Sequence, residues 1–537
     1  MMKKAIKKLM AALLAVAMVC AMAIPAFADT ESIREHHSFK AFQIFKGNVN
    51  DASEISNVEW GSCIHDYHDF LAELKKDPTL STPFQDADSL QKVLAVISTW
   101  HESDDNSIAF ARFVCHYLYP TADADPQPFI PTSGDVVQIP NDGAGYYLIV
   151  DTTYFNPGDS YHAYNSFLLN VTKAPWNLKV TPKVEKPSVK KEVFDNNDIG
   201  STGDNDGWHT SADHAINEEF KFRLTATLPA SYDNDRAYDY YDKYTVIFND
   251  TLSEGITFDR LDTVEITNGD GGASQVITDT HYKLDKNGLP SSFKLSIDDV
   301  KTCAPGLNLN NGATITVTYT AHLNDKAFVN TTSGSSTENK NSVQLQYSNN
   351  PRDTEAYWGF TPKSEVCVYT YQLNNTKYHD DDTPGNELAG AGFRLYSDEA
   401  CTPEQEVKLY KKDNFYYPIK DATDKAQDAV EMFSDEHGQF NVKGLDAGTY
   451  YLKETKTPDD YSPCPDKKIV ISATHTEYNV NLSGESNLNN KIINIKAGGI
   501  TLPSTGGIGT TIFYVVGGGL MVAAIVLLVT KKRMENK

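Results

Sequence analysis

Residues 444–455 read GLDAGTYYLKET, and they carry the alternating pattern of a β-strand. Successive side chains of a strand point to opposite faces of a sheet, so Tyr450, Leu452 and Glu454 share one face. The other two side chains on this face are apolar. We therefore expect the Glu454 carboxyl group to be buried in the core of a β-domain.

A charged side chain earlier in the same segment points the same way. One face of the expected strand carries the odd-numbered residues Tyr371, Leu373 and Lys377. This parity directs Lys377 toward the core that holds Glu454. Burial lowers the pKa of an amine and raises that of a carboxyl group, which yields a neutral amine and a protonated acid. Such an amine can attack an Asn side-chain carbonyl while the acid carries protons to the departing ammonia. The alternative is a plain buried ion pair, which carries a desolvation penalty.

Alternating, strand-like runs also occur in the rest of the chain. Runs such as TITVTY at 314–319 and VQLQY at 343–347 alternate and are separated by Asn, Asp and Gly turns. Clear helical patterning is confined to the N-terminal region, for instance at 70–74 and 90–97, where Ser89 can cap the second helix. We therefore expect a mainly β chain, in which tandem immunoglobulin-like β-sandwiches follow an α+β domain.

The length of 537 residues exceeds what one hydrophobic core serves, so several domains are expected. A Pro- and Lys-rich stretch ends the first domain, and a new strand-rich unit begins near Val366. The expected segments are a signal peptide at 1–28, an N-terminal domain at 29–175, a linker at 176–187, a middle domain at 188–365, a third domain at 366–498, an LPSTG motif at 502–506, a membrane-spanning helix at 512–529 and a basic tail at 530–537.

Both ends of the chain carry targeting patterns. Lysines precede the apolar stretch 9–27, and AFA at 26–28 has the form of a signal peptidase site, which predicts export and a mature chain from Asp29. An uncleaved anchor is the alternative. Near the other end, LPSTGG at 502–507 precedes an apolar run long enough to cross a bilayer and a cationic tail that should stay in the cytoplasm. An ordinary tail-anchored protein is the competing interpretation there.

The chain is acidic, with 48 Lys and Arg against 72 Asp and Glu and a formal net charge of −24 at pH 7. Nucleic acid and anionic lipid are therefore poor partners. We interpret the acidity as a solvated surface and not as a specific cation-binding property. The sequence has no CxxC and no Cys/His cluster, so we expect neither a metal nor a cofactor.

Six cysteines remain once Cys20 leaves with the signal peptide, and export permits disulfides. Connectivity cannot be read from sequence alone, but partition among domains favours pairing within each domain. Buried free thiols are the alternative for any pair. The favoured pairs are Cys63 with Cys115 and Cys401 with Cys464, which leaves Cys303 and Cys367 as the remaining pair, across a domain boundary.

The middle segment offers a second inward Lys, carboxylate and Asn. Alternation with neighbouring valines places Lys191 inward and Lys190 outward. Asp250 shares a face with apolar side chains of its own strand. Asn339 and Asn341 both align with an apolar face, and we prefer Asn341. The alternative is a turn-capping Asp and two polar strand residues.

These motifs resemble those of Gram-positive sortase-assembled major pilins, the backbone subunits of fimbriae. LAGAGFRLY at 388–396 and GLDAGTYYLKET are similar to signatures of Cna B-type domains, which often close a Lys to Asn isopeptide bond. The segments 244–258 and 339–351 are similar to stretches of the A-type domain. Residues 39–47 and 56–61 resemble pilin N-terminal domains. The resemblance implies two bonds, Lys377 to Asn494 with Glu454 as proton shuttle, and Lys191 to Asn341 with Asp250 as proton shuttle.

The resemblance also assigns the sorting signal, which consists of Leu502, Pro503, Ser504, Thr505 and Gly506. A sortase would cleave between Thr505 and Gly506 and transfer the Thr505 carbonyl to an amine. WNLKVTPK at 176–183 is similar to the pilin motif WxxxVxVYPK with two residues missing, which makes Lys183 the candidate amine of the next subunit. A solvated linker Lys is the alternative.

The implied function is a structural polymer subunit, secreted and linked to the cell wall, and not a turnover enzyme. Its implied partners are class C-type and housekeeping sortases, identical subunits and peptidoglycan, and a host receptor is a further candidate. One alternative is a minor pilin or single wall-linked adhesin that binds host protein or glycan, although no DxSxS sequence is present. The other is a wall-anchored hydrolase, for which no GxSxG or HExxH motif is found.

Overall fold

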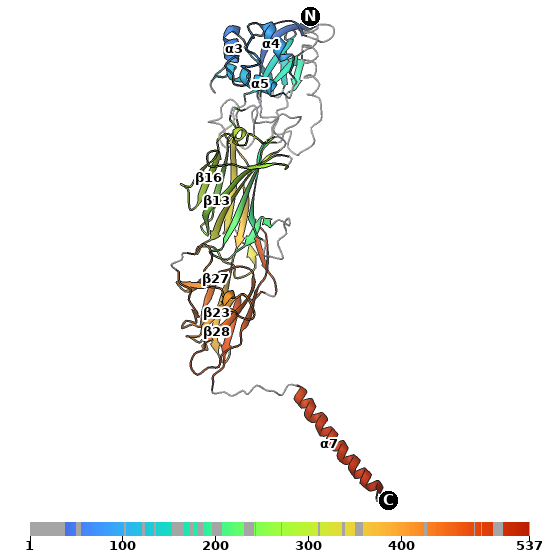
Figure 1. The fold of residues 1–537 in the computed structure, drawn as a ribbon, viewed down its shortest axis with the longest axis vertical. Coiled ribbons are helices and arrows are strands. Elements are labelled where there is room, and N and C mark those ends of the chain that lie inside the picture. The colour runs from blue at the N-terminus through green and yellow to red at the C-terminus, as the bar shows by residue number, and fades with distance from the viewer. Residues whose placement is uncertain are drawn as a thin grey trace.

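The computed structural model describes residues 38–535 except for 50–54, 101–103, 121–123, 134–135, 153–165, 172–175, 180–185, 196–206, 230–240, 242, 270, 310–311, 336–338, 350–357, 424–426, 477, 485 and 498–507. The predicted signal peptide, Lys183 and the LPSTG motif lie outside the described residues. The described part is an elongated molecule in which an α+β unit, two β units and a C-terminal helix follow one another along the longest axis (Figure 1). This confirms the predicted fold class.

The N-terminal unit packs three helices against one face of a sheet with the strand order β6-β5-β1-β3-β4-β7, with β2 beside β1. Its elements are β1 (Phe39–Val49), β2 (Ile55–Trp60), α3 (Tyr67–Leu74), α4 (Leu90–Ile97), α5 (Asp105–Leu118), β3 (Ile130–Ser133), β4 (Val136–Ile139), β5 (Gly145–Asp151), β6 (Ser166–Val171) and β7 (Trp176–Lys179). Helices α3 and α4 cover the predicted helical segments. Ser89 occupies the N-cap position of α4 but makes no capping hydrogen bond with its side chain, whereas the Asp66 carboxylate caps α3.

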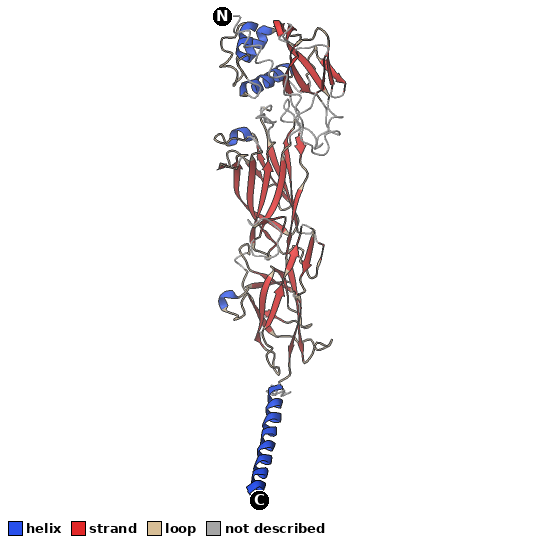
Figure 2. Cartoon of the chain, turned by 90° about the vertical axis from the view of Figure 1, so that its right-hand side faces the viewer, coloured by secondary structure: helices blue, strands red, loops and turns tan. Residues whose placement is uncertain are grey.

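The middle unit is a sandwich of two sheets with the orders β10-β21-β19-β12-β16-β15 and β14-β13-β17-β11-β8-β9. The strands of this unit run roughly along the long axis of the molecule (Figure 2). Apolar side chains from both sheets form one core. The elements are β8 (Ser188–Phe194), β9 (Trp208–His209), β10 (Ser211–Asp213), β11 (Glu219–Thr227), β12 (Val246–Leu252), β13 (Ile256–Thr267), β14 (Ser274–Val276), β15 (Lys283–Asp285), β16 (Ser292–Ile297), α6 (Val300–Cys303), β17 (Thr314–Leu323), β18 (Gly334–Ser335), β19 (Lys340–Ser348), β20 (Trp358–Phe360) and β21 (Ser364–Tyr369).

The third unit has sheets of order β24-β25-β27-β22-β32 and β26-β23-β28-β29. Its first strand, β22, and its last, β32, run parallel to each other, with Lys377 opposite Ile492. The elements are β22 (Tyr371–His379), β23 (Gly392–Tyr396), the 3₁₀-helix η3 (Pro403–Gln405), β24 (Leu409–Lys412), β25 (Phe415–Pro418), β26 (Met432–Phe433), β27 (Asn441–Leu445), β28 (Gly448–Lys456), β29 (Lys467–Ile471), β30 (Ala473–His475), β31 (Asn479–Leu482) and β32 (Asn489–Asn494). Helix α7 (Ile508–Glu535) follows.

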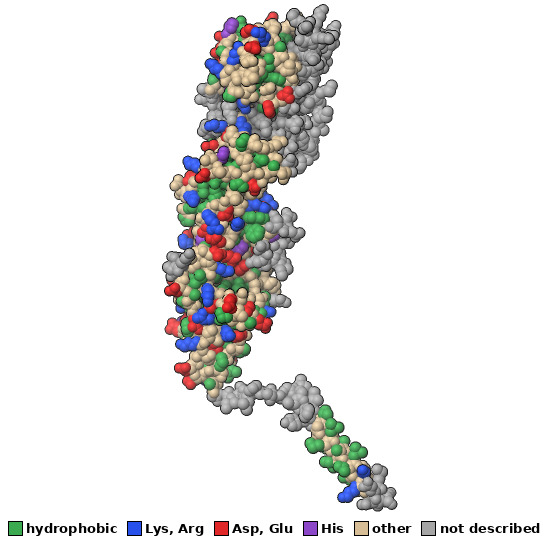
Figure 3. Space-filling view, viewed as in Figure 1, with side chains coloured by type: hydrophobic (Ala, Val, Ile, Leu, Met, Phe, Trp, Pro, Cys, Tyr) green, Lys and Arg blue, Asp and Glu red, His purple; other side chains and the backbone are tan. Residues whose placement is uncertain are grey.

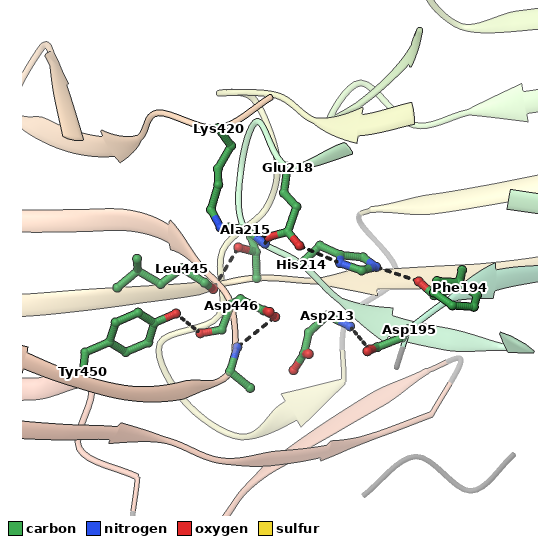
Figure 4. Close-up of polar contacts among 12 residues, drawn as sticks. Phe194, Asp195, Asp213, His214, Ala215, Glu218, Lys420, Leu445, Asp446 and Tyr450 are labelled. Atoms are coloured by element: carbon green, nitrogen blue, oxygen red, sulfur yellow. Dashed lines mark hydrogen bonds and ion pairs between the residues drawn. The ribbon is translucent and has the colours of Figure 1, made fainter. Parts of the chain in front are cut away.

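The two β units join through paired backbone. Strand β21 pairs with β10 and β19 of the middle unit and runs on into β22, so the predicted boundary at Val366 falls inside a strand. The Ile216 amide donates to the Gly444 carbonyl at 2.9 Å. Gly444 has φ +84°, and a Cβ there would lie 2.4 Å from Cγ1 of Ile216, so this approach requires glycine. Beside it, His214 lies between the Phe194 carbonyl and Glu218, which Lys420 approaches from the third unit (Figure 4).

On the face drawn in Figure 3, Asp and Glu side chains are interspersed with Lys and Arg over the two β units. Helix α7 includes the predicted segment 512–529, and the large apolar side chains from Val516 to Val529 are exposed. Among the described residues, however, no helix combines the length and the apolar character needed to cross a membrane. The predicted membrane span is therefore not confirmed.

The predicted disulfides are absent: none of the six cysteines in the described part of the chain forms one. Cys303 belongs to the core of the middle unit and Cys367 to that of the third unit, which separates them. Cys63 donates instead to the Gln43 carbonyl at 3.0 Å, so it is not paired with Cys115. The Cys401 thiol lies 3.9 Å from an Asp466 oxygen. Its predicted partner Cys464 lies beside Lys377 and Glu454.

Candidate crosslinking sites

A buried polar group lies between the two sheets of the middle unit. Strand β8 supplies Lys191, β12 supplies Asp250, β17 supplies Tyr319 and β19 supplies Asn341. Each of the four is at most 1% exposed. Alternation along each strand explains the placement, because each residue shares its face with apolar core side chains. Four strands thus bring an amine, a carboxyl, a phenol and a carboxamide into one closed space.

Hydrogen bonds link the four side chains, with the Tyr319 hydroxyl bonded to each of the other three. Nζ of Lys191 donates to Oδ2 of Asp250 and, at 2.9 Å, to the hydroxyl of Tyr319. The same hydroxyl accepts from Nδ2 of Asn341 at 2.5 Å and donates to Oδ1 of Asp250 at 3.2 Å. The amine also lies 5.1 Å from the ring centre of Phe222. The group is therefore surrounded by aromatic side chains and shielded from solvent.

Burial shifts the proton equilibria of this group toward neutral forms. Desolvation lowers the pKa of Lys191 to about 8, although Asp250 opposes the shift. Desolvation likewise raises the pKa of Asp250 above its ordinary value. A neutral amine is a nucleophile and a protonated carboxyl is a proton donor. The site can therefore hold the two forms that amide exchange requires.

The other candidates of the middle unit lie outside this group. The side chain of Lys190 is 61% exposed and pairs with Glu192 at 2.6 Å. Asn339 is buried, but its carboxamide is used by the Phe328 backbone, through bonds of 2.8 and 2.7 Å. The structure thus brings together Lys191, Asp250 and Asn341.

The third unit holds a second group of this kind. Lys377 on β22 donates through Nζ to Oδ1 of Asn494 on β32. Glu454 on β28 has Oε1 3.6 Å from that Nζ and accepts from Nδ2 of Asn494 at 2.8 Å. All three side chains are at most 1% exposed. Desolvation lowers the pKa of Lys377. The Glu454 side chain therefore contacts the amide nitrogen of Asn494 as well as the Lys377 amine.

Tyr319 and Cys464 are neighbours of these groups that the sequence reasoning missed. Tyr319 ends the predicted strand TITVTY, and a buried Tyr usually finds a hydrogen-bond partner, which is the signal that could have identified it. Cys464 donates its backbone amide to Oε2 of Glu454 at 2.8 Å. Burial raises the pKa of its thiol to about 11, so the thiol stays protonated beside Lys377.

One group of described residues could hold a metal ion. Asp195, Asp213 and His475 are buried, and their ligand atoms lie within 4.8 Å of one another. Tyr371 donates to Asp213 at 2.6 Å, and Ser211 contacts Nδ1 of His475 at 2.9 Å. The sequence did not predict this group, because its members are distant in sequence and meet where the two β units join.

A crosslink between Lys191 and Asn341, which these contacts would permit, should form at a rate that depends on pH. Because the pKa of Lys191 is lowered to about 8, its neutral fraction increases about tenfold per pH unit below that value. We expect the rate of linkage to rise with pH up to about 8 and then to level off, because the Lys191 amine is mostly neutral above that value. Unreacted chain refolded from inclusion bodies at a series of pH values, and followed by peptide mass spectrometry, measures this profile. A flat profile would contradict an ionisable amine as the reacting group.

Comparison with known families supports the C-terminal resemblances. A family model for the prealbumin-like fold domain matches residues 374–486, and one for the LPXTG cell wall anchor motif matches residues 494–536. The predicted resemblance to sortase-assembled major pilins is confirmed by these matches. The anchor motif indicates a location at the cell-wall surface. No curated protein matches the chain.

Solved pilin structures are similar to the chain at low identity. The pilus 2b backbone protein of group B streptococcus is 23% identical, with 54% of this chain and 97% of that chain covered and a TM-score of 0.39. The T6 backbone pilin of Streptococcus pyogenes serotype M6 is 16% identical, with 86% and 96% covered and a TM-score of 0.45. The major pilin SpaD of Corynebacterium diphtheriae is 16% identical, with 89% and 94% covered and a TM-score of 0.41.

Proposed function

We propose that the chain is the backbone subunit of a covalently polymerised surface pilus, strengthened by two internal Lys to Asn isopeptide bonds. The observation that carries the proposal is the repeated buried group of Lys, carboxyl and Asn in the two β units of a chain with an LPXTG anchor. A single buried ion pair would be weak support, because such pairs occur without chemistry. In the third unit the carboxamide contacts both members of the pair, and in the middle unit it contacts the Tyr319 hydroxyl that is bonded to both. Two such groups support amide exchange better than a lone ion pair does.

The chemistry is the same in both units. The neutral amine attacks Cγ of the Asn side chain, a new Nζ–Cγ bond forms, and the Cγ–Nδ2 bond breaks. The carboxyl group takes a proton from the attacking nitrogen and returns one toward the leaving nitrogen, which departs as ammonia. Glu454 in the third unit and Asp250 in the middle unit have this role. Neither carboxyl is consumed, and each domain reacts once, so the chain does not turn over a substrate.

Subunits would be joined through the sorting signal. In this proposal a class C-type sortase cleaves after Thr505 and transfers its carbonyl to the amine of Lys183 in the next subunit. A housekeeping sortase transfers the last subunit to peptidoglycan. The position of Lys183 between β7 and β8 supports this, because an interdomain segment can be reached by an enzyme. The exposed apolar side chains of α7 support a transient association of the precursor with the membrane.

The mass of the mature chain tests the internal bonds. Each bond makes the chain lighter by one ammonia, so the folded chain should be two ammonia masses lighter than its sequence mass. Peptide mapping should assign one linkage to Lys191 and Asn341 and the other to Lys377 and Asn494. A chain with the full sequence mass would refute both bonds. Monomeric protein in cell-wall extracts, with both bonds present, would refute polymerisation and leave a single wall-linked protein.

A further inference from the structure

The two candidate crosslinking sites differ in how the carboxyl group reaches the leaving nitrogen. In the third unit, Glu454 accepts directly from Nδ2 of Asn494 at 2.8 Å. In the middle unit the carboxyl belongs to an Asp, whose side chain is shorter by one methylene group. Nδ2 of Asn341 donates instead to the hydroxyl of Tyr319 at 2.5 Å.

The Tyr319 hydroxyl lies between the acid and the leaving group. It donates to Oδ1 of Asp250 at 3.2 Å, while Oδ2 of the same carboxyl contacts Nζ of Lys191. The hydroxyl therefore touches all three members of the proposed reaction. A chain of contacts leads from the attacking nitrogen through Asp250 and Tyr319 to the leaving nitrogen of Asn341.

We propose that Tyr319 is a catalytic proton relay, which carries a proton from Asp250 to Nδ2 of Asn341 as the isopeptide bond forms. The inference rests on the proposed bond between Lys191 and Asn341. As the Nζ–Cγ bond forms, Oδ2 of Asp250 takes a proton from Nζ. For the transfer, the phenol proton turns from Oδ1 toward Nδ2, and the acid proton on Oδ1 is directed at the Tyr319 oxygen. Oδ1 gives its proton to the Tyr319 oxygen, the phenol proton passes to Nδ2, and the Cγ–Nδ2 bond breaks as ammonia leaves. Asp250 and Tyr319 each lose one proton and gain one.

The surroundings of Tyr319 suit this role. Its ring is fully buried and packs against Phe222, Phe258 and Phe293, with ring centres 5.1–5.5 Å away. Desolvation and the nearby Asp250 raise the pKa of the phenol, so it keeps its proton at neutral pH. Because the group is closed to solvent, bulk water is a poor substitute for the relay.

The surroundings of the Asn341 carbonyl oxygen, Oδ1, also indicate that proton transfer to Nδ2 is the assisted step. Among the described residues, Oδ1 of Asn341 has no hydrogen-bond partner. The site therefore offers no described donor to an oxyanion that would develop on Oδ1. Its described contacts instead assist proton transfer at the leaving nitrogen. Removal of the relay should consequently affect the rate of bond formation strongly.

The test is Tyr319→Phe, which removes the hydroxyl and keeps the ring. Mature chain refolded from inclusion bodies is followed by peptide mass spectrometry. We expect the Lys191 to Asn341 linkage to form at least about 100-fold more slowly, the scale of general acid–base catalysis. The third unit should still close its own bond, which reports that the variant chain has folded.

A matched control and a rescue separate catalysis from packing. Tyr347→Phe removes another buried hydroxyl of the middle unit, one without a hydrogen-bond partner among the described residues, and should leave linkage unchanged. In the Tyr319→Phe background, Asp250→Glu lengthens the carboxyl side chain and should restore linkage at least partly. Unimpaired linkage in Tyr319→Phe would overturn the relay alone. A wild-type chain that never links Lys191 to Asn341 would overturn the bond and the relay together.

Discussion

Replacing Lys183 by Ala is expected to abolish the ladder of high-mass covalent species in cell-wall extracts. The proposed joint needs an amine to release the Thr505 acyl group from the sortase, and Ala supplies none. Secreted monomer and wall-linked monomer should remain, because wall attachment uses an amine of peptidoglycan. Immunoblots of wall extracts measure the ladder directly.

The controls for this experiment come from neighbouring positions. Lys190→Ala removes an exposed amine that pairs with Glu192 and should keep the ladder. Thr505→Ala should remove both the ladder and wall attachment, since it destroys the acyl donor. A ladder that persists in Lys183→Ala, and disappears when another Lys of 176–190 is replaced, would reassign the joining amine.

Glu454→Gln is expected to abolish the bond between Lys377 and Asn494. The amide keeps the volume of the side chain but cannot shuttle protons. Loss of the carboxylate leaves the Lys377 amine buried without its partner, which lowers the free energy of unfolding by about 3–5 kcal/mol. Loss of the crosslink removes a further contribution of about 2–4 kcal/mol from the restricted unfolded chain.

Intact mass measures the loss of the bond, and thermal unfolding measures the loss of stability. The mass of Glu454→Gln should exceed that of the crosslinked wild type by about one ammonia, because the Glu to Gln change itself alters the mass little. Glu436→Gln serves as the matched control, because that side chain is 87% exposed. It should leave the linkage and the unfolding temperature unchanged. A crosslinked Glu454→Gln chain would show that another group moves the protons.

Side-chain parity predicted much of the two candidate sites. Alternation along a strand placed Lys191, Asp250, Lys377 and Glu454 on inward faces, and these side chains are buried in the structure. This works because the period of a strand is two, so an apolar face identifies its polar members. The β-sandwich architecture followed from the same patterns.

The contacts between strands could not be obtained in this way. Tyr319 is separated by 128 positions from Lys191 and by 69 from Asp250. Parity places each residue on a face but does not say which side chains of different strands meet. The predicted disulfides are not confirmed, for a related reason. Cys464 was paired with Cys401 because both lie in the same expected domain. The fold instead directs Cys464 toward Lys377.

In the third unit the proposed bond joins the first strand to the last, which run parallel to each other. This placement limits the length of chain that the unit can release when it is pulled. Lys377 and Asn494 are 117 positions apart in the sequence. An extended chain spans at most about 3.3–3.6 Å per residue, so the intervening chain corresponds to roughly 400 Å. With the proposed bond closed between β22 and β32, a pulling force passes across this short joint, and the whole intervening length stays folded. A fibre of such subunits would keep its length under load even where a domain's hydrogen bonds yield.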